Sequence, residues 1–391
     1  MEVESRLSKR SHKVHWSGIR VMFDLAGNIP GVINLGLGEP DFDTPKHIRE
    51  SAKKALDEGY TRYPPSAGFR DLREAVAFKL KRENNITADP YSEIFISVGA
   101  MQGIFNTILH LVNPGDEVIV IDPGYDYYAQ IKLFDGIPIQ VPAYEQNHFK
   151  VDPDDIEKAV THKTKLMILN TPSNPTGAIL DQEILGQISK IGQRNGILVL
   201  SDEPYEKIIF DGKKHLSIAS LEGMKSSTIS VFTFSKTYAM PGWRVGYVVA
   251  DKCIIAEMEK TMEHMTSGVT TVSQRAALAS IQGHQDDAEE MVKEYEKRRN
   301  ILCEGLNKIE GITCSMPEGA FYAFPNISSF SMTSWDFAKF LLDVSKVATI
   351  PGSIFGNRGE GFLRISFAAN IALLQEAISR IEEGIRLLQK K

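Results

Sequence analysis

Cysteine is scarce in this chain. Only three cysteines occur in 391 residues (Cys253, Cys303 and Cys314), an odd number without CxxC spacing. This excludes a disulfide scaffold and a thiolate zinc site, and it favours a reducing compartment. The first 24 residues mix charges with isolated apolar side chains, so we expect no secretory signal. We therefore predict a cytoplasmic location.

An excess of one charge is also missing. The chain has 44 Lys and Arg against 50 Asp and Glu, a formal net charge of −6. Such a mildly acidic protein has no bulk electrostatic reason to bind nucleic acid or an anionic membrane. The scattered histidines show no ligand spacing, so we predict no metal site. Hydrophobic residues make up 42% of the chain, which argues against a disordered or fibrous protein.

A long apolar run is absent too. Residues 94–115 carry no charge, but polar side chains and two glycines interrupt them. A membrane span would be strongly apolar over about 20 residues. We therefore expect no membrane span, and predict instead a buried strand, a turn at Gly99-Ala100, and a buried helix.

Short β-branched runs alternate with helix-like segments through the middle of the chain. The runs are residues 94–98, 117–121, 165–169, 197–201, 229–232 and 244–250. Several are apolar on both sides, as in the strands of a buried parallel sheet. The last third combines helical segments (254–265, 273–282, 286–311 and 371–388) with strand-like residues 320–324 and 361–367. This order predicts a large α/β domain, residues 46–280, and a smaller α+β domain from residues 1–45 and 281–391.

Polar residues follow the ends of these runs. Asp122 begins a turn, Asn174 lies in an Asn-Pro-Thr-Gly motif, and Asp202 and Lys236 each follow a strand-like run. Taken singly, each has an ordinary structural role, such as a turn, a helix cap or a solvated lysine. In an open α/β sheet, however, ligands bind outside the carboxyl ends of the strands. Together with the turn at Gly99-Ala100, these make five strand ends with residue types suited to function, and they predict one functional crevice.

The motifs 235–244 (SKTYAMPGWR), 174–177 (NPTG) and 201–205 (SDEPY) together resemble the signature of class I/II pyridoxal-phosphate aminotransferases. The spacing also agrees: 28 residues from Asn174 to Asp202, three more to Tyr205, and eight from Lys236 to Arg244. The similarity extends from Gly36-Leu-Gly38-Glu-Pro-Asp-Phe to Leu363-Arg364-Ile-Ser-Phe. It implies the fold type I of pyridoxal-phosphate-dependent transferases, with a mainly parallel seven-stranded sheet. It also implies a homodimer with shared active sites.

The resemblance assigns roles to residues around a pyridoxal 5'-phosphate cofactor. Lys236 would be the Schiff-base lysine and the proton shuttle. Asp202 would pair with the pyridine nitrogen, Asn174 and Tyr205 would bond the phenolic oxygen, and Tyr125 would stack on the ring. The expected catalytic residues are Lys236, Asp202 and Tyr205.

Further residues are expected to bind the phosphate and the substrate. The residues expected to bind the cofactor phosphate are Gly99, Ala100, Met101, Thr233, Ser235, Arg244 and the partner subunit's Tyr63. Arg364 resembles the arginine that binds the substrate α-carboxylate, with Gly38 and Asn174 beside it.

The expected reaction moves an amino group from an L-amino acid to 2-oxoglutarate by a ping-pong mechanism. The amino acid is expected to be aspartate or aromatic. The resemblance places the determinants of substrate choice in residues 17–25, at Met101, and in residues 264–271, which are expected to reach the partner subunit. Residues 264–271 lack the arginine that classical aspartate enzymes use, and Arg275 lies beyond them. This argues against strict dicarboxylate specificity, although Lys and Arg of the N-terminal segment could compensate. The alternatives are a lyase that catalyses β- or γ-elimination with the same lysine, and an aminotransferase of the kynurenine or alanine type.

Overall fold

The computed structural model describes residues 6–14, 16–27 and 29–390. Its larger domain is built on a seven-stranded sheet in the order β2-β8-β7-β6-β5-β3-β4. The strands are β2 (Ile94–Ser97), β3 (Glu117–Asp122), β4 (Ile137–Pro142), β5 (Thr164–Asn170), β6 (Leu198–Asp202), β7 (Thr228–Thr233) and β8 (Gly246–Val249). Only β8 runs antiparallel to its neighbours, so the prediction of a mainly parallel sheet is confirmed.

Side chains that alternate along the strands pack into two separate cores. On β3, Val118 and Val120 belong to the core shared with α4 (Gly99–Leu111), whereas Ile119 belongs to the core shared with α7 (Gln182–Asn195). Because successive side chains of a strand point to opposite faces, helices cover both faces of the sheet. The uncharged stretch 94–115 thus forms β2 and α4, as predicted. In the described part of the chain, no helix combines the length and apolar character needed to cross a bilayer.

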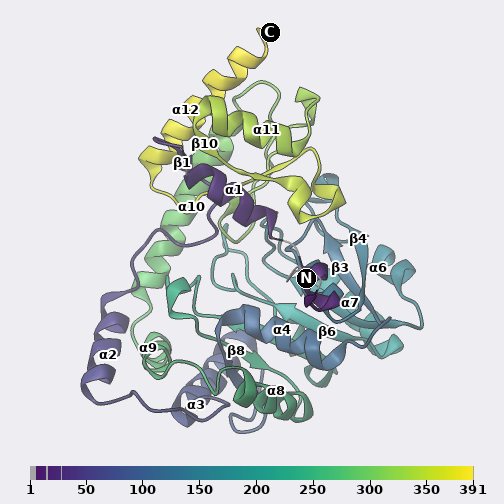
Figure 1. Ribbon diagram of the computed structural model, residues 1–391, viewed down its shortest axis with the longest axis vertical. Coiled ribbons are helices and arrows are strands. Elements are labelled where there is room, and N and C mark those ends of the chain that lie inside the picture. Colours follow the sequence, from purple (N-terminus) through teal and green to yellow (C-terminus); the bar gives the residue numbers. More distant parts are fainter. Residues whose placement is uncertain (1–5, 15, 28, 391) are drawn as a thin grey trace.

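The other helices of the larger domain surround this sheet (Figure 1). They are α2 (Lys46–Asp57), α3 (Arg70–Lys79), α5 (Tyr128–Leu133), α6 (Pro153–Ala159), α8 (Lys252–Met265) and α9 (Thr271–Gln282). The predicted helices 254–265 and 273–282 correspond to α8 and α9.

The smaller domain brings the two ends of the chain together. Near the N-terminus, α1 (Gly18–Gly27) is followed by β1 (Ile33–Asn34), which pairs in parallel with β10 (Val347–Ala348). An antiparallel sheet joins β11 (Ile350–Pro351), β12 (Leu363–Ser366) and β9 (Tyr322–Ala323). The helices are α10 (Asp286–Leu306), α11 (Ser334–Phe340) and α12 (Ile371–Leu388). Figure 1 shows α10 rising from the larger domain to pack beside α12. The boundaries at residues 45/46 and 280/281 stay a proposal.

Three details differ from the sequence prediction. No strand was expected at β4, which contains Pro138 and Pro142 and lies at the edge of the sheet, where a missing N–H donor is tolerated. The predicted strand 244–250 is too long, since β8 begins at Gly246. Arg244 precedes it with a φ of 51°, in the left-handed region, and ends a short 3₁₀ turn. The predicted helix 286–311 ends earlier, at Leu306.

Candidate active site

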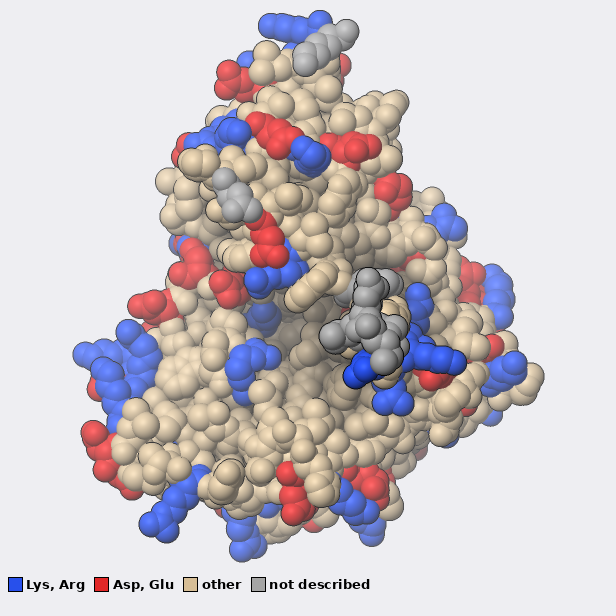
Figure 2. Space-filling model, in the orientation of Figure 1, with Lys and Arg blue, Asp and Glu red and all other residues tan. Residues whose placement is uncertain are grey.

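A cavity of about 280 Å³ lies at the carboxyl ends of the central strands, between the two domains. Figure 2 shows that this face of the molecule is hollowed in its middle. Of the residues predicted from the sequence, those that line the cavity are Gly38, Ala100, Met101, Tyr125, Asn174, Asp202, Tyr205, Thr233, Ser235, Lys236, Arg244 and Arg364. The structure therefore brings together residues separated by more than 300 positions in the chain.

Gly99 and Tyr63 are the two predicted residues that do not line this cavity. Gly99 has a φ of 69°, and a Cβ there would lie 2.6 Å from Nη2 of Arg244, so glycine gives the guanidinium room. Tyr63 is 88% exposed and lines a separate groove together with residues of the segment 266–272. Tyr63 therefore does not contribute to the cavity of its own chain.

Asp202 ends β6 and is buried in the cavity wall. The hydroxyl of Tyr127 donates a hydrogen bond of 2.7 Å to its Oδ2, whereas its Oδ1 is buried and finds no hydrogen-bond partner among the described residues. Burial raises the pKa of Asp202 to about 7, against the opposite effect of the Tyr127 hydrogen bond. The carboxylate thus lacks one partner inside the cavity.

Lys236 follows β7 and faces the same space. Its Nζ donates a hydrogen bond to the backbone carbonyl of Gly38 and lies 5.6 Å from the centroid of the Phe321 ring. Burial lowers the pKa of Lys236 to about 8, and the positive charges of Arg364 and Arg244 act in the same direction. At this pKa, roughly a tenth of the amine is neutral at pH 7, and this fraction can act as a nucleophile or base.

Arg364 comes from β12 in the smaller domain and is almost fully buried. Its Nη1 donates to Oδ1 of Asn174 (3.1 Å) and its Nη2 to the carbonyl of Gly36 (2.6 Å), while its Nε is buried without a partner. The guanidinium carbon lies 4.5 Å from the ring centroid of Tyr322. The expectation that this arginine lies on a buried strand is confirmed.

The other end of the cavity can bind an anion. The hydroxyls of Thr233 and Ser235 lie 2.8 Å apart, and the guanidinium of Arg244 is held by a 2.8 Å hydrogen bond to the carbonyl of Pro241. Ala100 and Met101 lie in the first turn of α4, where free N–H groups and the helix dipole favour negative charge. Hydroxyls, a guanidinium and a helix N-terminus together form a phosphate-type site.

Sequence reasoning missed several residues that the structure places here. The cavity is also lined by Ile19, Ile104, Asn170, Pro204 and Tyr322, and Tyr127 lies behind Asp202. The hydroxyl of Tyr322 lies 2.9 Å from that of Tyr205, which is therefore engaged within the protein. The Nδ2 of Asn170 donates to the carbonyl of Asp202, and its Oδ1 accepts the N–H of Asn174. For Tyr127 a signal existed in the tyrosine run 125-YDYY-128, directly after a strand-end Asp-Pro-Gly turn.

The cavity therefore holds a buried amine, a carboxylate with one unpartnered oxygen, and donors that suit an anion. Residues 30–381 match the family described as aminotransferase class I and II, to which the chain therefore belongs. The protein is a transaminase, and enzymes of this class use pyridoxal phosphate.

Named relatives agree with this family. The chain is 44% identical over 383 residues to an aspartate aminotransferase of Pyrococcus abyssi, and 43% identical over 383 residues to aromatic-amino-acid aminotransferase 2 of Thermococcus litoralis. Each alignment covers 97% of this chain and 98% of the relative. These similarities support an amino-acid aminotransferase activity.

Solved structures show the same fold. An aromatic aminotransferase from Pyrococcus horikoshii superposes with a TM-score of 0.89 at 42% identity, covering 95% of this chain and 99% of that one. An aspartate aminotransferase from Thermus thermophilus with maleate gives a TM-score of 0.93 at 32% identity, covering 97% and 99% of the two chains.

Replacing Tyr127 by Phe tests how Asp202 is tuned. The substitution removes the only hydrogen bond to the carboxylate side chain found among the described residues, so the pKa of Asp202 should rise. A hydrogen bond to a charged group contributes about 1.5–3 kcal/mol, and one pH unit corresponds to about 1.4 kcal/mol. The acid limb of kcat/KM should therefore move up by about one to two pH units. Tyr322→Phe, which removes a hydroxyl from the same cavity without touching Asp202, should leave that limb in place. An unmoved limb in Tyr127→Phe would contradict this assignment.

Proposed function

We propose that this transaminase transfers the amino group of aspartate or an aromatic amino acid to 2-oxoglutarate, by a ping-pong mechanism with pyridoxal 5'-phosphate. The observation that supports the proposal most strongly is the pairing of two buried groups in one cavity. Lys236 has a lowered pKa, and Asp202 presents a carboxylate oxygen without a partner. Buried polar groups of this kind are rare unless a ligand completes them.

The cavity fits the proposed cofactor in its chemistry. The unpartnered Oδ1 of Asp202 suits a protonated ring nitrogen, Lys236 offers an amine for covalent attachment, and the anion site suits the phosphate. Tyr125, which lines the cavity, offers an aromatic face for the ring. When bound, pyridoxal phosphate would stabilise the electron pair that remains on the substrate Cα after its proton has left.

Each predicted residue has a place in this proposal. Asn174 and Tyr205 would hold the phenolic oxygen. The phosphate would be held by Ala100, Met101, Thr233, Ser235 and Arg244, with Gly99 making room for the arginine. Because the hydroxyl of Tyr205 now bonds Tyr322, we expect Tyr205 to exchange that partner, or to share it, when the site is filled.

Lys236 would also move the proton. The Nζ of Lys236 lies in a buried site that lowers its pKa to about 8, so about half of the free amine would be neutral near pH 8. A neutral Nζ can accept the Cα proton as a general base, and the resulting ammonium can return it as a general acid. Catalytic efficiency favours a group whose pKa lies close to the operating pH, as is the case here.

The α-carboxylate of the substrate is proposed to bind Arg364. Its guanidinium already has Asn174 and the carbonyl of Gly36 as partners, and its Nε still lacks one. A carboxylate would add the opposite charge and the missing acceptor. Gly38 lies beside it: a Cβ at this position would meet the hydroxyl of Tyr322 at 2.5 Å, so a side chain there would crowd the cavity wall.

The substrate side chain is proposed to extend toward α1. A neighbouring pocket of about 440 Å³ shares Ile19, Gly38 and Tyr125 with the main cavity. Among the described residues that line this pocket, Arg20 is the only Lys or Arg, and it forms an exposed ion pair with Asp24. Arg275 is already bound to both carboxylate oxygens of Asp71 (2.5 and 2.6 Å). Arg20 could therefore meet the distal carboxylate of a dicarboxylate, whereas Ile19, Met101 and Ile104 offer apolar contacts to an aromatic ring.

A homodimer with shared sites is part of the proposal. Tyr63 is exposed and lies in a groove with residues 266–272, so both segments expected to reach a second subunit share one surface. The phosphate contact predicted for Tyr63 can then be made only by the partner subunit's Tyr63. We also propose a cytoplasmic location, because all three cysteines are free.

Incubation of the holoenzyme with an amino acid and 2-oxoglutarate tests the reaction. We expect glutamate to form in step with the new 2-oxo acid, and the cofactor-bound protein to be yellow. Lys236→Ala should lose the yellow imine band and at least about 1000-fold in activity, because general acid–base and covalent contributions both disappear. Ammonia release without glutamate would instead favour a lyase, and wild-type turnover by Lys236→Ala would disprove the mechanism.

Substrate choice is tested by comparing kcat/KM for aspartate and phenylalanine in Arg20→Gln. Loss of a charge-assisted contact of about 1.5–3 kcal/mol should lower the value for aspartate roughly 10- to 100-fold and leave that for phenylalanine within about twofold. Arg20→Lys, which keeps the charge, should restore part of the aspartate activity. Equal losses for both substrates would show that Arg20 does not read the distal carboxylate.

A further inference from the structure

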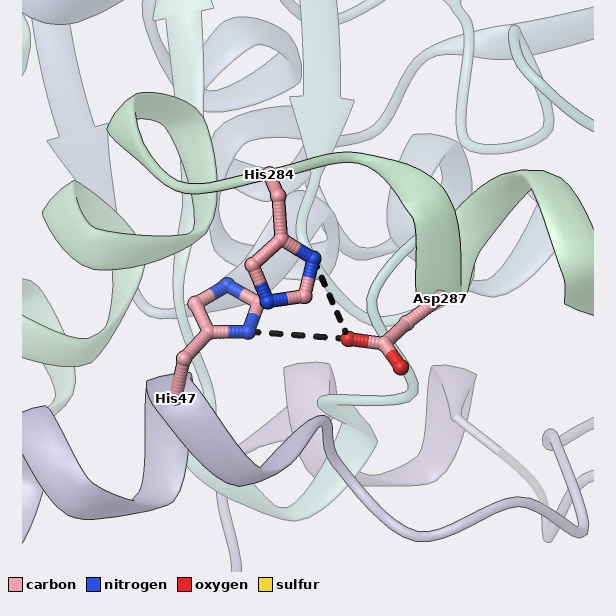
Figure 3. A group of neighbouring side chains, drawn as sticks. All are labelled: His47, His284 and Asp287. Atoms are coloured by element: carbon pink, nitrogen blue, oxygen red, sulfur yellow. Dashed lines mark ion pairs between the residues drawn. The ribbon is translucent and has the colours of Figure 1, made fainter.

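A second group of chemically active side chains lies outside the cavity. His47 projects from the first turn of α2, His284 from the short connection between α9 and α10, and Asp287 from the first turn of α10. Figure 3 shows the two imidazole rings and the carboxylate converging on one point. We call these three residues the His-His-Asp cluster. Its ligand atoms all lie within 4.8 Å of one another.

The distances in the cluster suit a shared ion better than direct hydrogen bonds. Oδ2 of Asp287 lies 3.6 Å from Nδ1 of His47 and 3.7 Å from Nδ1 of His284. Hydrogen bonds between nitrogen and oxygen are usually about 2.7–3.2 Å long. Two ligands that each lie about 2.0–2.1 Å from a tetrahedral zinc ion are about 3.3 Å apart. A bound ion would therefore draw the three side chains closer together than the 4.8 Å within which their ligand atoms now lie.

His47 lacks the partners that its position calls for. Both of its ring nitrogens are shielded from solvent, and neither has a hydrogen-bond partner among the described residues. Buried polar atoms are nearly always satisfied, so an unpaired imidazole beside another imidazole and a carboxylate points to a ligand. An imidazole binds a metal through the lone pair of a ring nitrogen.

The surroundings leave room for the rings and for an ion. A Cβ on Gly283 would lie 2.7 Å from Cδ2 and Nε2 of His47, so the glycine before His284 lets the two histidines approach. The side chains of His284 and Asp287 are 54% and 45% exposed, which gives an ion a path from solvent. Asp287 also lines an open groove of about 550 Å³, whose walls carry acidic residues (Asp43, Glu290 and Glu294) and basic ones (Lys293, Lys297 and Arg298).

We propose that His47, His284 and Asp287 form a binding site for a divalent transition metal ion, with Zn²⁺ as the reference ion. Two imidazoles and one carboxylate are a ligand set that suits Zn²⁺ and excludes Mg²⁺, which prefers oxygen ligands. The site is separate from the active-site cavity and does not depend on the proposed reaction.

The position of the site suggests a structural role. A bound ion would join α2 to the start of α10, the helix that leads from the larger to the smaller domain. Gln285, which follows His284 in the chain, accepts a hydrogen bond from the hydroxyl of Tyr238. Tyr238 in turn lies two positions after Lys236. Since binding to the native state stabilises it by mass action, Zn²⁺ should raise the melting temperature.

Calorimetric titration of the chelator-treated holoenzyme with Zn²⁺ tests the proposal. We expect one Zn²⁺ to bind per chain in addition to any weak, non-specific binding, and we expect a rise in melting temperature that Mg²⁺ does not produce. His284→Ala and Asp287→Asn, which change partly exposed side chains, should weaken this binding at least tenfold and abolish the rise. His162→Ala, which removes an exposed histidine elsewhere, should behave as wild type.

The proposal is overturned if wild type binds no Zn²⁺ at concentrations up to about 1 mM, or if His284→Ala binds it as tightly as wild type does. Anomalous scattering at the zinc absorption edge gives a second measurement that is independent of stability. It should place the ion between the three side chains. An ion found only at the cofactor site or elsewhere on the surface would equally refute the site.

Discussion

The central constraint in this structure is the burial of opposite charges that the protein itself does not fully pair. Lys236 and Asp202 lie in one cavity, where burial pushes the pKa of the amine down and that of the carboxyl up. Removing charges from water costs free energy unless partners compensate it. Here Asp202 receives only the Tyr127 hydroxyl, and its second oxygen has no partner. In the proposed function, the ring nitrogen and the aldehyde of pyridoxal phosphate would complete these two groups.

The two domains divide the work of building that site. Parallel strands β5 and β6 and the following loops bring Asn174 and Asp202 to one edge of the large sheet. The smaller domain supplies Arg364 on β12, and the N-terminal segment supplies Gly38 and Ile19. The hydrogen bond from Lys236 to Gly38 and that from Arg364 to Gly36 connect the three parts. Pairing of β1 with β10 explains how the chain ends reach the site together.

Much of this arrangement could be predicted from the sequence. Apolar β-branched runs and strand-end polar residues indicate the sheet and its functional edge, because both follow from local periodicity and from the geometry of parallel strands. Strand β4 could not be found, since its prolines mask an edge strand. Ile19 lies in the segment 17–25, which was expected to contribute to substrate choice, whereas Tyr322 was missed because its place depends on how the domains pack. The His-His-Asp cluster was missed for the same reason, as His47 and His284 lie far apart in the chain and show no ligand spacing.

The account depends most directly on the partner of Asp202 Oδ1. Nitrogen-15 NMR of the holoenzyme, reconstituted with pyridoxal phosphate labelled at the ring nitrogen, reports whether that nitrogen carries a proton. We predict a protonated ring nitrogen in the wild type and an unprotonated one in Asp202→Asn, with the cofactor still bound. An unprotonated nitrogen in the wild type, or the same chemical shift in both proteins, would contradict the account.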